Sequence, residues 1–311
     1  LISITGLVTN TAMSLNTSST VWEYFWTLPP SVTTGTYAVT VAATDTTSKS
    51  YSGNERLDIS IAPTFYLGGN GLTVKCPAAS NGETGVINGK TYTAVDETAL
   101  RSKINNGDAD LDCVCTSLVT DMSSLLRDKN SFNQDIGSWD TSNVTTMNQM
   151  FLRAYQFNQN IDAWNTSNVT NMQEMFKNAD DFNSPIGSWD VSSVTTMREM
   201  FYGVSSFNQD IGTWNVSAVT NMSFMFQNAS SFNQSINSWN VSNVTNMGYM
   251  FYAATAFNQP LNNWIPHPWT LLITCSNWHQ ALINLLIIGI YRRQLIWNIC
   301  LLTQQHLIKV F

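Results

Sequence analysis

The feature that most constrains this chain of 311 residues is a period of 25 residues that runs through its second half. Tryptophan, phenylalanine, methionine and asparagine each recur in register with this period. A fixed period between roughly 20 and 50 residues is typical of stacked repeats, because each unit buries its apolar face only against its neighbours. Three of the repeating columns are Trp139, Trp164, Trp189, Trp214, Trp239 and Trp264; Phe151, Phe176, Phe201, Phe226 and Phe251; and Asn133, Asn158, Asn183, Asn208, Asn233 and Asn258.

One repeat carries two patterns of different period. Four apolar residues at spacing i, i+3, i+4 and i+7 indicate one stripe of a short helix: Met147, Met150, Phe151 and Ala154. Thr146 followed three residues later by Gln149 has the form of a capping box for that helix. The next copies repeat this pattern, with Asn171 and Glu174 and with Thr196 and Glu199. Residues 136–139 are typical of a short strand that would pair in parallel with its equivalents. We therefore predict a repeat solenoid over residues 117–264, with a short parallel strand plus a short helix in each 25-residue coil.

Columns that repeat and positions that vary have different expected roles. We expect the tryptophan and methionine columns to form the core, and the asparagine column to hydrogen-bond exposed backbone from coil to coil rather than to contact a ligand. Positions that differ between repeats are the candidates for an interaction face, although plain solvation would explain them as well. These candidates are Asp135, Asn160, Asp210, Ser235, Arg153, Lys177 and Tyr202.

The repeat resembles that of a known family. Its consensus reads Met-Phe-x-x-Ala-x-x-Phe-Asn-Gln-x-Ile-x-x-Trp-Asp/Asn-x-Ser-x-Val-Thr-x-Met, with matching copies over residues 117–264. This pattern resembles the repeats of bacterial surface proteins akin to the BspA-like leucine-rich-repeat family. The resemblance implies a leucine-rich-repeat-like fold, display on a cell surface, and roles in adhesion or in a matrix. The sequence contains no anchor motif, and the repeat motif itself defines no binding residue that could be transferred.

Two different segments precede the repeats. Residues 1–62 alternate apolar and polar side chains, with expected strands at 37–41 and 57–61, which favours a fragment of an immunoglobulin-like β-sandwich acting as a spacer. Residues 63–116 contain strand-like stretches at 72–76 and 90–94, a hairpin signal at Asn88-Gly89, and a short helix from about Glu97 to Asn105. We expect this small α+β unit to be the N-terminal cap that covers the first coil.

Composition narrows the possible functions. Net charge is −7 with no cluster of basic residues, so nucleic acid is not an expected partner. All three histidines fall in the last 47 residues, which leaves the body without histidine for acid–base catalysis or metal binding. Calcium at the column of Asp140, Asn165 and Asp190 is a weak alternative, because a neutral asparagine alternates with the carboxylates. We predict no enzyme activity, no cofactor and no metal site.

The cysteines leave their pairing open. Three of the five precede the repeats: Cys76, Cys113 and Cys115. In an exported protein Cys76 would bridge to Cys115 or to Cys113. Free buried thiols are the alternative.

The pattern stops after Trp264, and residues 265–311 contain no acidic residue. The apolar run at 281–291 is too short to span a membrane. A shifted reading frame joins the third base of each codon to the first two bases of the next codon. This frame permits aspartate at 264–265, phenylalanine-asparagine-glutamine at 282–284 and tryptophan at 289, all in phase with the repeat. Position 272 does not fit the repeat in this frame. We therefore predict that this tail is a frameshifted continuation of the repeats. A nucleotide sequence without those codons would contradict the hypothesis.

These observations predict an extracellular or cell-surface repeat protein. The first hypothesis is an adhesion or interaction scaffold whose partner is an unknown protein or glycan. The alternative is a structural spacer or matrix protein with no specific ligand. Because the chain begins at Leu1 rather than at methionine, we expect it to be a fragment of a longer protein.

Overall fold

The computed structural model describes residues 64–265 throughout and, between residues 2 and 59, the backbone of strands β1 to β6. The chain divides into two compact units, Leu1–Pro63 and Thr64–Phe311. This division lies one residue from the boundary predicted between the first domain and the cap. From residue 266 onward the predicted frameshifted tail lies outside the described residues, so its origin stays a prediction.

The first unit is built from antiparallel strands. A four-stranded sheet has the order β2-β1-β5-β6, and a separate pair joins β3 to β4. The bounds are β1 Ile2–Ile4, β2 Val8–Thr11, β3 Ser14–Leu15, β4 Trp22–Glu23, β5 Gly35–Thr44 and β6 Ser50–Ile59. The strand predicted at 37–41 lies within β5, and the one predicted at 57–61 overlaps the end of β6. An immunoglobulin-like sandwich stays a prediction.

The second unit opens with four short strands and one more that follows a helix. Strand β7, Tyr66–Leu67, pairs antiparallel with β8, Val74–Lys75. A hairpin joins β9, Thr84–Ile87, to β10, Lys90–Ala94, and β11, Val114–Cys115, adds to β10 in parallel. Asn88 and Gly89 have positive φ angles of 52° and 80°, the conformation that a two-residue type I′ turn needs. The predicted hairpin is therefore confirmed.

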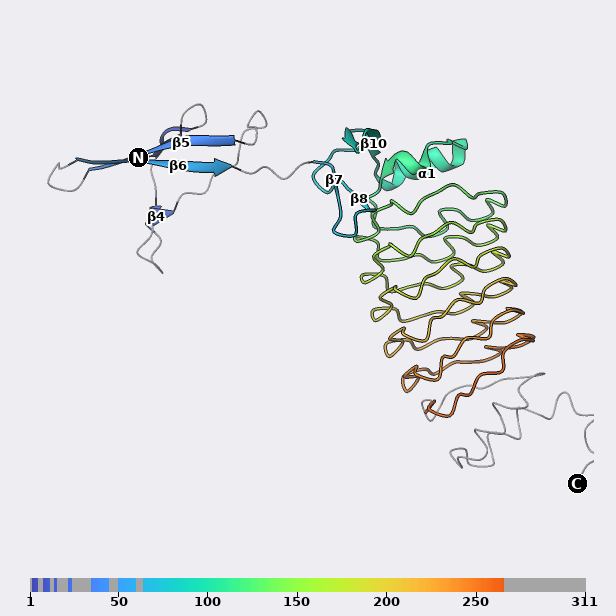
Figure 1. The fold of residues 1–311 in the computed structure, drawn as a ribbon. Helices are drawn as coiled ribbons and strands as arrows, with labels where there is room; N and C mark the ends of the chain where they lie inside the picture. The colour runs from blue at the N-terminus through green and yellow to red at the C-terminus, as the bar shows by residue number, and fades with distance from the viewer. Residues whose placement is uncertain are drawn as a thin grey trace, which may run out of the picture. The chain divides into compact units, whose positions relative to one another are not determined.

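Helix α1 spans Glu97–Asn106, in agreement with the predicted helix to within one residue. It begins where the Asp96 carboxylate accepts the Ala99 backbone N–H at 2.8 Å, and it ends at Gly107, whose φ is 77°. These are the expected signals for the two ends of a helix. Leu100 and Ile104 on its inner side are buried in the same apolar cluster as the first coil. Through this contact α1 covers one end of the repeats (Figure 1).

Residues 117–264 form coils that lie one on the next, which Figure 1 shows from green to orange. We call this segment the coil stack. Each coil makes a one-residue parallel β-bridge to the next, at positions spaced by the repeat: Asp121, Thr146, Asn171, Thr196, Asn221 and Asn246. The strand expected at 136–139 is absent from this described segment, because parallel pairing occurs ten residues later in the repeat.

The predicted helix in each repeat is wrong. In the coil that begins near Thr146, the N–H groups of Gln149, Phe151 and Arg153 donate to carbonyls of the next coil instead of to carbonyls four residues back. Between them, Met150 N–H donates to the Met147 carbonyl three residues earlier, as in a β-turn. Gln149 and Arg153 have φ angles of 58° and 59°, which a right-handed helix does not allow. Successive turns give the same spacing of buried side chains as a helix, so the apolar stripe does not distinguish the two.

The core of the coil stack consists of columns of like side chains. Neighbouring tryptophans lie parallel with ring centroids 6.3 Å apart, as in Trp139 with Trp164. Each indole N–H donates to a carbonyl of the preceding coil, for example from Trp189 to Ile161 at 3.1 Å. Within a coil, Phe176 stacks on Phe182 at 4.0 Å. A buried tryptophan is stable only when its N–H has a partner, and here the preceding coil supplies that partner.

The asparagine column joins the coils at the surface. The Asn183 side-chain oxygen accepts the backbone N–H of Asn208 at 2.9 Å, and the amide of Gln209 donates to the same oxygen at 3.1 Å. The same bond recurs along the column, as from the Asn158 N–H to Asn133. The predicted hydrogen bonding from coil to coil is therefore confirmed.

Candidate interaction surface

The outer residues of the coil stack fall into columns that repeat and columns that vary. The asparagine, serine and threonine columns are nearly constant, and their side chains hydrogen-bond the backbone of a neighbouring coil, as Thr195 does with the Thr170 carbonyl. Among the columns that change from coil to coil, four lie on the run of turns after the β-bridge, and we call these four together the variable face. They are Asn148, Gln173, Arg198, Ser223 and Gly248; Gln149, Glu174, Glu199, Phe224 and Tyr249; Leu152, Lys177, Tyr202, Gln227 and Tyr252; and Arg153, Asn178, Gly203, Asn228 and Ala253.

The variable face lies on the run of turns described above. Most N–H groups that do not close turns pair with the next coil, and those of the Asn148 column donate to the side chain two residues earlier, as Gln173 does to Asn171 at 2.9 Å. None of these bonds uses a side chain of the variable face itself. Two of the four columns, those of Gln149 and Arg153, take positive φ in every coil. Because the backbone bonds are the same in each coil, the side chains here are freer to differ than those of the asparagine or tryptophan columns.

The middle of the variable face holds a network of ion pairs. Glu174 and Glu199 are 8% and 5% exposed, which is unusual for carboxylates unless they are paired. Lys177 and Arg198 both contact Glu199 and lie 3.6 and 3.7 Å from Glu174. Burial alone would raise the pKa of Glu174, but a hydrogen bond from Gln173 and the nearby cations hold the pKa below its usual value. The carboxylate is therefore ionised at neutral pH.

Toward the C-terminal coils the variable face becomes aromatic. The Lys177 ammonium lies 5.1 Å from the centre of the Tyr202 ring, and the Phe224 and Tyr249 rings stack at 5.2 Å. Tyr252 meets Tyr249 edge-on at 6.0 Å and is 37% exposed. Cations over aromatic rings contribute about 0.5–1 kcal/mol at exposed sites. The face thus changes from charged to aromatic along the direction of stacking.

A family model described as "Mycoplasma protein of unknown function, DUF285" matches residues 97–201 and 183–270. Together these segments cover more than half of the chain. The chain belongs to the DUF285 family. No curated protein and no solved structure matches it.

The DUF285 segments begin at the first residue of α1 and include the whole variable face. Strands β1 to β6 lie outside them. The family description names no activity, so any function of this chain has to be argued from its own residues.

The predicted interaction residues separate into two groups. Arg153, Lys177 and Tyr202 lie on the variable face, where Lys177 and Tyr202 are in contact. The others, Asp135, Asn160, Asp210 and Ser235, form an exposed column just after the asparagine column. No hydrogen bond, ion pair or ring contact within residues 64–265 joins the two groups. The sequence therefore identified parts of two surfaces and not one face.

Several residues of the variable face were missed from the sequence. Glu174 and Glu199 were interpreted as capping residues of helices that are not there, and their neighbour Arg198 was not considered. Phe224, Tyr249 and Tyr252 were also overlooked: Tyr249 and Phe224 share a column with the two glutamates, and Tyr252 shares one with Tyr202. Comparison of each column along its whole length, without assuming a helix, would have identified all of them.

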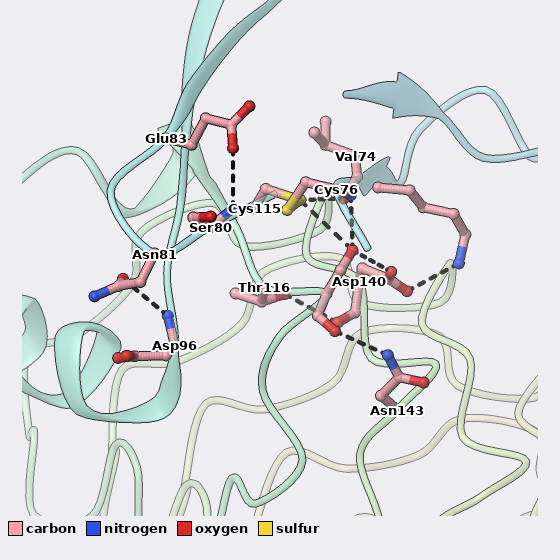
Figure 2. The surroundings of a disulfide bond; sticks show 12 residues. Val74, Cys76, Ser80, Asn81, Glu83, Asp96, Cys115, Thr116, Asp140 and Asn143 are labelled. Carbon is pink, nitrogen blue, oxygen red and sulfur yellow. Dashed lines mark hydrogen bonds and ion pairs between the residues drawn. A yellow bond between two sulfur atoms is a disulfide. The ribbon is translucent and has the colours of Figure 1, made fainter. Parts of the chain in front are cut away.

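At the other end of the stack, a disulfide within the cap lies beside a buried aspartate of the first coil that binds the cap (Figure 2). Of the pairings that the sequence left open, the structure has Cys76–Cys115, and Cys113 is a free thiol. Asp140 is 2% exposed and accepts hydrogen bonds from Ser117 at 2.6 Å and from Lys75 at 3.1 Å. Figure 2 shows Asp140 beside the disulfide. These contacts hold β8 against the coil stack.

The proposed calcium column has a structural role in the described coils. Asp140, Asn165 and Asp190 each accept the backbone N–H of the residue two positions later, which is the Asx-turn arrangement. Among the described residues, no group of three or more histidine, cysteine, aspartate or glutamate side chains is placed to hold a metal ion. Nor does that part of the chain contain a helix that is long and apolar enough to cross a membrane.

Proposed function

We propose that this chain is a non-catalytic interaction scaffold of a cell surface, in which the coil stack acts as a solenoid that presents the variable face to a protein or glycan partner. One observation carries the proposal. Within coils whose tryptophan, phenylalanine and asparagine columns barely change, the four columns of the variable face differ from coil to coil and yet contain buried ion pairs and packed aromatic rings. Scattered solvated residues would not be expected to pack against each other in this way.

The composition of the face suits protein recognition. Tyrosine and arginine are the residue types enriched where binding energy concentrates in interfaces, and the face offers Arg198, Tyr249 and Tyr252 close together. Ion pairs beside the rings would set the orientation of a partner more than its affinity.

An extracellular location has two supports. The buried Cys76–Cys115 disulfide is a bond that persists in oxidising compartments and is rare in the cytosol. Charged residues make up only 11% of the chain, and neutral asparagine, serine and threonine ladders cover much of the stack. Both agree with the resemblance of the repeat to BspA-like surface proteins, which stays a prediction.

A purely structural spacer is the second candidate. The observation that favours it is that most outer columns serve stacking, since their polar side chains bond the neighbouring coil rather than solvent. A spacer needs only this stacking, and its variable positions would have no common partner.

A binding screen separates the two candidates. The full chain would be tested on arrays of extracellular proteins and of glycans, beside the double variant Y249A/Y252A. Loss of one interface aromatic that contributes about 2 kcal/mol weakens binding by about 30-fold, so loss of both should weaken it by more than that, and by about 1000-fold if the two effects add. The matched control is T245A/T255A, which removes two exposed side chains that bond the preceding coil, outside the variable face. Consistent silence of the unmodified chain on both arrays would favour the spacer.

A further inference from the structure

A recessed surface, separate from the variable face, lies between the cap and the first two coils. It encloses about 450 Å³, within the usual range for small-ligand sites. We call it the cap cleft. Its walls come from the loop after β7, the β9–β10 hairpin, and the turns that follow the asparagine column in two consecutive coils. The residues used below are Leu72, Lys90, Asp112, Asp135 and Asn160.

Two residues of the cleft were already candidates from the sequence. Asp135 and Asn160 occupy the same position in neighbouring coils. Each uses Oδ1 to accept a backbone N–H, from Gly137 at 2.9 Å and from Asp162 at 3.0 Å. Within residues 64–265, Oδ2 of Asp135 and Nδ2 of Asn160 have no hydrogen-bond partner. The cleft therefore offers one strong acceptor and one donor, side by side on rigid turns.

The opposite wall supplies a charge pair and an apolar surface. Lys90 donates to the Asp112 carboxylate at 2.7 Å and to its backbone carbonyl at 2.9 Å. Leu72 is 61% exposed, one of the most exposed large apolar side chains among the described residues. Asn70 in the same loop donates to the Ala163 carbonyl at 3.4 Å, which ties the loop to the second coil. The cleft is therefore lined by an apolar side chain as well as by these polar groups.

We propose that the cap cleft binds a neutral sugar unit of a glycan. A sugar ring carries hydroxyl groups that both donate and accept, and it has an apolar C–H face. Asp135 Oδ2 would accept from one hydroxyl, Asn160 Nδ2 and the Lys90 ammonium would donate to others, and Leu72 would cover the C–H face. Two carboxylates against one ammonium disfavour an anionic ligand. A lipid chain would bury these polar groups without partners, at a cost of a few kcal/mol each.

The repeat itself provides a matched control. Asp210 stands in the same column as Asp135 and lies two coils beyond Asn160. Its Oδ1 accepts the Gly212 N–H at 2.9 Å. D210A therefore removes the same turn contact as D135A but leaves the cap cleft intact. D210A also controls for the turn contact that N160A removes, since Asn160 accepts the Asp162 N–H in the same manner. S235A is a second control that changes the same column outside the cleft, where no such contact is made within residues 64–265.

The test uses the full chain with neutral mono-, di- and trisaccharides of glucose, galactose, mannose and N-acetylglucosamine, and with sulfated and sialylated sugars for comparison. Binding is followed by ligand-observed NMR and titration, and the melting temperature of each variant is recorded. We expect at least one neutral sugar to bind, with roughly tenfold weaker affinity in D135A and in N160A. D210A, S235A and Y249A/Y252A should bind like the unmodified chain, and the last of these makes the test independent of the variable face.

Three results would overturn the proposal. One is the absence of binding to every neutral sugar of the panel. Another is binding that D210A weakens as much as D135A does, which would point to a general change in the turns. The third is a preference for sulfated or sialylated sugars over neutral ones, because an anionic ligand contradicts the charge argument.

Discussion

The cap and the coil stack are held together in different ways, although α1 shares its apolar core with the coils. The cap, residues 64–116, relies on elements that each occur once: a hairpin, helix α1 and the Cys76–Cys115 disulfide. The coil stack contains neither helix nor extended strand, and every coil repeats the same contacts to its two neighbours. A contact that is lost by mutation in the cap is therefore made nowhere else in the chain's described part. A contact that is lost in one coil is flanked by intact copies of the same contact in the neighbouring coils.

The largest effect should come from a core column in the middle of the stack. W189A removes an indole that is 3% exposed, stacks on Trp164 and donates to the Ile161 carbonyl. We expect the free energy of unfolding to fall by about 3–5 kcal/mol, since the neighbours are fixed by their own coils and cannot fill the cavity. Chemical denaturation measures the loss. A change below about 1 kcal/mol would contradict the picture of interlocked columns.

The second effect concerns the cap alone. C76S/C115S opens a link between residues separated by 39 positions, and we expect a loss of about 2–4 kcal/mol. Hydrogen exchange should show faster exchange in β8, β10 and α1, with little change in the coils farthest from the cap. Equal acceleration throughout the described coils would mean that cap and stack unfold as one unit, and the comparison above would fail.

A smaller effect, with a pH signature, is expected at the junction. Burial alone would raise the pKa of Asp140, but hydrogen bonds from Ser117, Ser142 and Lys75 lower it below 3.8. Because the pKa of Asp140 is lower in the folded chain, its carboxylate stabilises the fold at pH values above its unfolded pKa near 4. This contribution is lost as the pH falls through the pKa of the folded state. D140N should cost about 1–3 kcal/mol at pH 7.

Comparison of D140N with the unmodified chain at several pH values tests whether the charge of Asp140 matters. The stability difference between D140N and the unmodified chain should shrink as the pH is lowered from 5 to 3, as followed by thermal unfolding at each pH. A difference that stays constant over this range would show that the charge of Asp140 has no part in holding the cap.

The smallest effect should come from the asparagine column, which forms a ladder of hydrogen bonds at the surface of the stack. N183A removes the acceptor for the Asn208 N–H, which is exposed so that water can replace it, and for the partly buried Gln209 amide. We expect a loss of about 0.5–1.5 kcal/mol by chemical denaturation. A loss as large as that of W189A would mean that the ladder, and not the core columns, carries the stability of the stack.

The two regions also differ in how far their structure could be predicted from the sequence. In the cap, the Asn88-Gly89 turn and the Asp96 and Gly107 ends of α1 are local signals, and the hairpin and helix followed from them. In the coils, the burial of Met147, Met150 and Phe151 was predicted correctly, but their conformation was not. Hydrogen bonds between residues 24 positions apart decide that conformation, and no local propensity reports them.

The candidate surface was predicted in part for the same reason. Lys177 and Tyr202 were identified because they vary, whereas Glu174 and Glu199 were assigned to helix caps. Asp135 and Asn160 were identified without any sign that the cap lies opposite them. The cleft joins segments on either side of the cap helix, and the repeat pattern carries no information on how the cap folds against it.

The central claim is that recognition depends on residues that vary between coils, while the repeating columns serve stacking. It is tested most directly by the affinity of the partner found in the array screen for single variants taken in pairs from the same coils. Variants of the variable face are paired with threonine variants of a repeating column: K177A with T170A, Y202A with T195A, and both Y249A and Y252A with T245A. The account predicts that face variants weaken binding by about tenfold or more at the central positions, while the threonine variants leave it unchanged. Equal effects in both series would contradict it.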